Sequence, residues 1–129
     1  MNNQKGITLI GAIFVLIIVS LLGTYLVKIY SVQQKTSILA LQTARAYQTA
    51  NAGIEWGIAS VVNNGSCVAS TTLTPNLSNF SVTVTCQQLG SYSENINTKN
   101  VYLITAKSQF SSYGSSDYIS RNMQTTIHD

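Results

Sequence analysis

Residues 7–27, ITLIGAIFVLIIVSLLGTYLV, form an uncharged apolar stretch that only a bilayer or a protein interior can cover. As an α-helix it would be about 32 Å long, which matches the hydrocarbon core of a membrane. Lys5 stands just before the stretch and Lys28 just after it. A secretory signal peptide has a shorter apolar core followed by a small-residue cleavage site, and neither is seen here. We therefore predict a retained transmembrane helix over residues 7–27.

The helix is predicted to continue beyond the membrane, because no proline occurs before Pro75. Past Lys28 the apolar residues recur at steps of three and four, which predicts an amphipathic helix over residues 28–62. The expected apolar stripe consists of Val32, Leu39, Ala40, Ala44, Tyr47, Ala50, Ile54, Ile58 and Val61. This stripe would pack against the remainder of the chain.

Three glycines occur near the C-terminal end of this predicted helix. Gly53 and Gly57 each weaken a helix by about 1 kcal/mol relative to alanine, and we interpret them as places where a strand or loop approaches closely. Asn63, Asn64 and Gly65 follow the last apolar residues. We expect the helix to end there, with Gly65 as a left-handed cap.

The region after the helix, residues 63–129, reads as β-structure. Apolar and polar residues alternate with the two-residue period of a strand. Three strands are predicted, at residues 80–86, 101–110 and 118–127, separated by turns at 90–100 and 111–116. The fold class is therefore α+β, with one long N-terminal helix packed on a small antiparallel sheet of about three strands.

The two cysteines, Cys67 and Cys86, lie in the part expected outside the cytoplasm. A single disulfide between them is the natural interpretation in an oxidising compartment. The alternative is a pair of buried free thiols. A bridge would close about 20 residues and stabilise the fold by roughly 3 kcal/mol.

Chemistry-bearing residues are sparse. The net charge is +3, and the basic residues are scattered, so we expect no nucleic-acid partner. His128 stands near the end of the sequence, and no carboxylate pair has acid–base spacing. Glu55 is either a partner contact or a solvated carboxylate, and the adjacent Trp56 is interpreted as packing against the sheet. We predict neither enzymatic activity nor a metal or cofactor.

Residues 5–10, KGITLI, resemble the cleavage region of type IV prepilins, at the start of the apolar helix. In that family a membrane peptidase cuts after the glycine and methylates the new amino terminus. The resemblance implies a leader over residues 1–6, cleavage between Gly6 and Ile7, and N-methylation of Ile7. The small residues Thr8, Gly11, Ala12, Ser20 and Gly23 lie loosely on one side of this helix, where they could allow close packing.

Gly11 departs from the family pattern, because most pilins carry glutamate at this position. A carboxylate at membrane depth is costly and is retained only for function. In the family this glutamate is thought to pair with a neighbouring subunit's N-terminal amine, which Gly11 cannot do. We therefore expect a minor subunit, of the kind found at the filament tip, rather than the major one.

A narrower resemblance covers about residues 4–90. The segments 46–57 (AYQTANAGIEWG), 65–67 (GSC) and 80–86 (FSVTVTC) resemble the MshP family of minor pilin-like biogenesis proteins of mannose-sensitive haemagglutinin (MSHA) pili, which are PilX-like. This implies a part in pilus assembly and surface attachment. The implied partners are other pilin and minor pilin subunits, the prepilin peptidase, the inner-membrane assembly platform and, before assembly, lipid.

The expected location is the inner membrane, with a single pass and the C-terminal domain in the periplasm, and later the pilus surface. The cysteines and the Ser, Thr and Asn content of the C-terminal domain favour this orientation, although Lys28 argues against it. Three alternatives remain open: a type II secretion pseudopilin, a DNA-binding competence pilin, and a one-pass periplasmic protein that is never processed.

Overall fold

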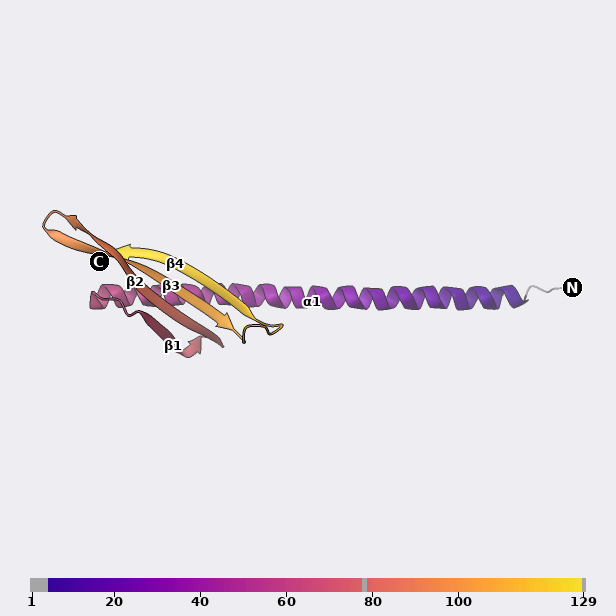
Figure 1. Cartoon of the computed structure of the whole chain (residues 1–129). Helices are drawn as coiled ribbons and strands as arrows, with labels where there is room; N and C mark the ends of the chain where they lie inside the picture. Colours follow the sequence, from indigo (N-terminus) through magenta and orange to yellow (C-terminus); the bar gives the residue numbers. More distant parts are fainter. Residues whose placement is uncertain (1–4, 78, 129) are drawn as a thin grey trace. The chain divides into compact units, whose positions relative to one another are not determined.

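The computed structural model describes residues 5–77 and 79–128, and the side chains of all of these except residues 5–7 and Pro75. One helix is followed by four strands: α1 (Lys5–Asn64), β1 (Ser70–Leu77), β2 (Phe80–Glu94), β3 (Asn97–Phe110) and β4 (Ile119–His128) (Figure 1). The α+β class is confirmed, with four strands where about three were predicted. The chain divides after Ile38 into two compact units, here called the N-terminal unit and the C-terminal unit.

α1 ends where the sequence predicts. The last helical residue is Asn64, and Gly65 follows with a φ of 60°, in the left-handed region. The Gly65 backbone N–H donates a hydrogen bond of 2.8 Å to the Val61 carbonyl oxygen. This bond satisfies one of the carbonyls that a helix end leaves open, so Gly65 acts as the predicted cap.

The four strands form one antiparallel sheet in the order β1-β2-β3-β4. The predicted segments 101–110 and 80–86 fall within β3 and β2, and 118–127 falls on β4 apart from its first residue. β1 was not predicted. It contains Pro75 and pairs only with β2, with a register shift between Leu73 and Leu77. Proline is tolerated there because an edge strand has one side without ladder partners.

The turn predicted at residues 90–100 is wrong. β2 and β3 remain paired as far as Glu94 and Asn97, and only Asn95 and Ile96 form the turn between them. Asn95 has a φ of 55°, which asparagine adopts more readily than other non-glycine residues. Gly90 marks a register shift inside the hairpin rather than its end.

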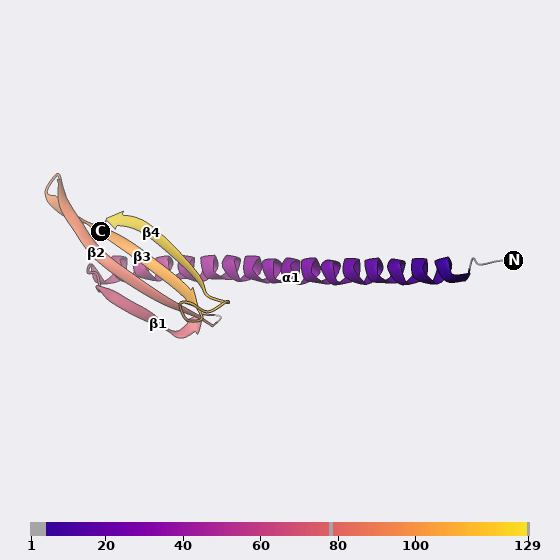
Figure 2. The same ribbon diagram turned by 45° about the vertical axis from the view of Figure 1, so that its right-hand side comes forward.

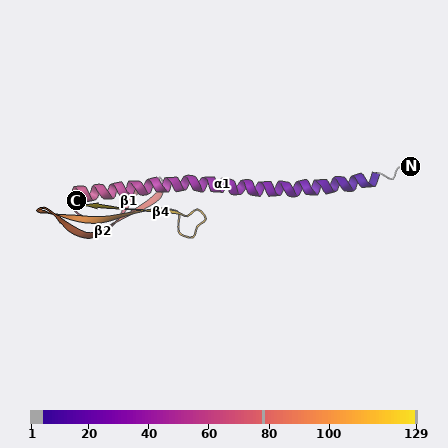
Figure 3. The ribbon, with the colours of Figure 1, turned by 90° about the horizontal axis from the view of Figure 1, so that it is seen from above.

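The core of the C-terminal unit lies between α1 and one face of the sheet, which covers one side of the helix (Figure 3). Tyr102, Ile104, Ala106 and Ser108 alternate along β3 and are all buried. The main core cluster consists of Ile54, Val61, Val82, Val84, Tyr102, Ile104 and Ala106, and a second cluster of Ala46, Phe80 and Ile119.

The predicted apolar stripe is only half right. Its C-terminal members are buried or partly buried, whereas Val32, Leu39, Ala44 and Tyr47 are exposed. The buried residues of α1 are Ala46, Thr49, Ala50, Gly53, Ile54, Gly57 and Val61, and four of them, Ala46, Thr49, Gly53 and Gly57, are small residues outside the predicted stripe. The face of α1 that contacts the sheet is therefore rotated about the helix axis from the face that carries the largest apolar residues.

Gly53 and Gly57 are the points of closest approach between α1 and the sheet. A Cβ atom added to Gly57 would lie 2.6 Å from Ile104 Cγ2, and one added to Gly53 would lie 2.8 Å from Val82 Cγ1. Both distances are shorter than carbon atoms tolerate. The interpretation of these glycines as sites of close approach is confirmed.

A buried hydroxyl pair also joins the helix to the sheet. The oxygen atoms of Thr49 and Ser108 lie 2.6 Å apart, and Thr49 Oγ1 also lies 3.0 Å from the Ala46 carbonyl oxygen. Both residues are almost fully buried. The pair satisfies two polar groups that would otherwise be costly in this core.

We expect Thr49→Val to lower the free energy of unfolding by about 2 kcal/mol, because it leaves the Ser108 hydroxyl buried without its partner. Ser108→Ala should cost about 1 kcal/mol, since Thr49 keeps its bond to the Ala46 carbonyl. Urea unfolding of the full chain in detergent micelles measures both values. Equal losses for the two single variants would contradict this assignment.

Candidate functional site

The N-terminal unit presents an apolar helix with no cover of its own. Every described side chain from residue 8 to residue 38 is exposed, and no charged residue occurs before Lys28 in this stretch. By length and composition, α1 could cross a membrane, and none of its most apolar window is buried within the protein. An apolar surface of this size requires lipid or another protein around it.

The processing residues predicted from the resemblance fall at the start of α1. Gly6 and Ile7 have helical backbone. Residues 1–4 of the predicted leader lie outside the described residues, as do the side chains of residues 5–7. At Gly11 nothing outside the helix's own backbone lies within 4 Å of an added Cβ. The position of the family's glutamate is therefore open to a neighbour.

Two tyrosines that the sequence analysis did not single out mark the end of the uncharged stretch. Tyr25 and Tyr30 are exposed on either side of Lys28. Tyrosine and lysine are enriched at the membrane–water interface, where an apolar stem and a polar tip are both accommodated. Their positions on either side of Lys28 are the sequence signal that could have identified them.

Cys67 and Cys86 form a disulfide, with their Cα atoms 5.6 Å apart. It joins the segment after α1 to β2, and both residues pack against the main core cluster.

Trp56 lies beside this bridge and is 40% exposed, so it packs on the rim of the core. Glu55 is exposed and accepts a hydrogen bond of 3.4 Å from Asn51, as a solvated carboxylate would.

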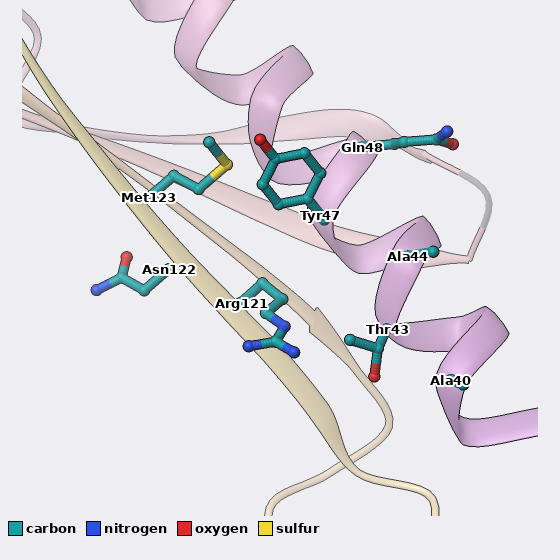
Figure 4. A pocket seen from close by; sticks show the side chains of 8 residues that line it. All are labelled: Ala40, Thr43, Ala44, Tyr47, Gln48, Arg121, Asn122 and Met123. Atoms are coloured by element: carbon teal, nitrogen blue, oxygen red, sulfur yellow. The ribbon is translucent and has the colours of Figure 1, made fainter. Parts of the chain in front are cut away.

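An open groove of about 660 Å³ lies between α1 and the edge strand β4, within the C-terminal unit. Tyr47 and Met123 face each other across it, and Arg121 reaches from β4 into the space between β4 and α1 (Figure 4). Arg121 is the only charged residue of the lining. The lining residues are Ala40, Thr43, Ala44, Tyr47, Gln48, Arg121, Asn122 and Met123.

Titratable residues do not gather at this groove or elsewhere in the described chain. Among residues 5–77 and 79–128, no group of three His, Cys, Asp or Glu residues could hold a metal ion. Gln109 Nε2 donates a hydrogen bond of 3.0 Å to Tyr118 Oη, which lowers the pKa of that phenol, with Ser120 and Lys107 acting in the same direction. His128 is exposed, edge-on to Tyr92.

Comparison of the chain with protein-family models, with curated proteins and with solved structures found no match.

Proposed function

We propose that this chain is a minor pilin-like subunit of a type IV pilus of the MSHA type, acting in pilus assembly and thereby in surface attachment. The observation that carries the proposal is the KGITLI segment at the start of a helix whose residues 8–27 carry no charge and are all exposed. Support also comes from the C-terminal unit, in which an antiparallel sheet packs on the second half of the same helix.

The physical basis is an exchange of similar surroundings. Before assembly the helix is covered by lipid, and after removal of the leader it is covered by the helices of neighbouring subunits. Lipid and apolar side chains are close to equivalent in hydrophobicity, so the assembly machinery supplies only the difference. The small residues Gly11 and Gly23 allow close helix contacts.

The N-terminus of the mature chain tests this proposal directly. In cells that make pili, we expect mass spectrometry of the purified protein to find N-methyl-isoleucine at residue 7. Deleting the prepilin peptidase should leave the chain starting at Met1, and so should Gly6→Val, which adds bulk at the cleavage site. An intact Met1 in pilus-producing cells would refute the proposal.

A type II secretion pseudopilin would carry the same processed N-terminus, so location separates the two functions. A pilus subunit is recovered with filaments sheared from the cell surface, and its deletion reduces attachment. A pseudopilin is absent from that fraction, and its deletion blocks secretion. A competence pilin would instead retain DNA, with affinity that falls steeply as salt rises.

A further inference from the structure

The β2–β3 hairpin carries an unusual tip. It projects past the end of α1 in the C-terminal unit (Figures 1 and 2). Tyr102 Oη lies 3.4 Å from the Gly65 carbonyl oxygen, which marks the level at which the helix ends. From there β3 continues to Asn97, about 17 Å further along the hairpin. The turn residue Ile96 is 97% exposed, more than any other large apolar residue described.

A single exposed isoleucine is ordinary on a protein surface, but this one has a charged neighbour without a partner. Glu94 pairs with Asn97 at the base of the turn, and its carboxylate makes no ion pair within the described residues. The tip therefore presents an exposed aliphatic side chain and, two residues earlier in the sequence, a carboxylate without an ion pair among the described residues.

The groove between α1 and β4 offers the complementary surface. Its bed is formed by Ala40, Ala44, Tyr47 and Met123, and Arg121 supplies a positive charge that forms no ion pair with any described residue. A volume of about 660 Å³ is in the range that binds a compact group, about 300–1,000 Å³. The groove thus suits an occupant that is both apolar and anionic.

The other described carboxylates do not fit this description. Glu55 lies near the C-terminal end of α1 and accepts a hydrogen bond from Asn51, and Asp117 follows a serine-rich loop. A chain cannot place its own tip in its own groove, because the two are on the order of 40–50 Å apart along the helix and hairpin. The occupant that combines both properties is the tip of a second copy.

We propose that the hairpin tip of one copy docks in the groove of another, with Ile96 on the apolar bed and Glu94 paired with Arg121. Such a contact is head-to-tail, so repeating it gives a line of copies rather than a closed pair. It goes beyond the proposed function, which names no contact between copies of this chain.

Photocrosslinking of the full-length chain in detergent micelles tests this contact. Half of the chains carry ¹⁵N, and benzoylphenylalanine replaces Ile96, an apolar change at an open position. We expect crosslinked peptides that join a heavy to a light chain, between position 96 and residues 40–48 or 121–123. The same crosslinker at Tyr113, which is 90% exposed on another loop, should give no such product.

Charge exchange provides the specific readout. Glu94→Arg and Arg121→Glu should each lower the heavy–light yield about fivefold, and the double variant should recover most of it. Glu55→Arg changes the total charge as Glu94→Arg does and should leave the yield unchanged. Crosslinks within one chain, to other surfaces or not at all would overturn the proposal. So would an equal loss in the double variant, or capture of a different protein by position 96 in intact cells.

Discussion

Gly57→Leu is expected to lower the free energy of unfolding of the C-terminal unit by about 3 kcal/mol. The first added carbon would already lie 2.6 Å from Ile104 Cγ2 and 3.2 Å from Val84 Cγ1. Ile104 is fully buried and branched at Cβ, so its methyl group cannot turn aside. The gain in helix propensity, about 1 kcal/mol, is smaller than the cost of moving the sheet. Fluorescence of Trp56, the single tryptophan, follows urea unfolding of the full chain in detergent.

A matched control lies two residues further along the same helix. Ala59 is exposed, so Ala59→Leu should change the unfolding free energy by less than about 0.5 kcal/mol. Combining Gly57→Ala with Ile104→Ala should cost less than the sum of the single changes, because the cavity at 104 accepts the added methyl group. If Gly57→Leu behaves like Ala59→Leu, the close approach of helix and sheet is not a feature of the protein in solution.

The long helix and its end were predictable because their signals are local. An uncharged stretch, the absence of proline before Pro75 and a glycine after two asparagines act through the backbone of neighbouring residues. Strands with one buried face, such as residues 80–86, also give a clear signal, since alternation records burial directly.

The row of α1 residues that faces the sheet was predicted only in part, because hydrophobic periodicity favours large residues. Where the sheet comes within contact of the helix backbone, this row also contains small residues that the pattern left out, such as Ala46 and Gly53. Tyr47 and Leu39 dominate a hydrophobicity pattern and yet remain exposed. Gly53 and Gly57 did indicate the correct face, because glycine destabilises a helix interior and its presence there indicates close packing.

β1 and the end of the β2–β3 hairpin were missed because in neither do apolar residues alternate with polar ones along the whole length of the strand. β1 contains serine, threonine and Pro75, a composition typical of loops. Its position at the edge of the sheet allows a strand of this composition to form. The far part of the hairpin is exposed on both faces, so only pairing between its strands reveals it. In the sequence alone, Gly90 resembles a turn residue, whereas in the sheet it marks a register shift.

The groove could not be predicted from the sequence. Its walls come from residues 40–48 of α1 and residues 121–123 of β4, which meet only after the sheet has placed β4 beside the helix. The processing segment is the opposite case, since KGITLI is continuous in the sequence. Its role rests on resemblance and remains a prediction.

Replacing both cysteines by serine should lower the free energy of unfolding by about 3 kcal/mol. The bridge spans 19 residues in sequence, and the loop it closes contains the whole of β1. β1 pairs only with β2, so the disulfide is the second connection that holds it. Without the bridge the unfolded chain gains conformational entropy, and this gain is larger for a long closed loop than for a short one. Urea unfolding of Cys67→Ser/Cys86→Ser against the unaltered chain gives the difference.

The reducing agent dithiothreitol separates the bridge from the serine side chains. It should destabilise the unaltered chain by a similar amount and leave the double variant unchanged. Hydrogen exchange should rise most in β1, because residues 70–77 lose their tether and can open locally, while the amides of β3, held between two neighbouring strands, should accelerate only as far as the lower free energy of global unfolding requires. Equal acceleration in β1 and β3 would contradict this view, since it would mean that β1 does not open separately from the rest of the sheet.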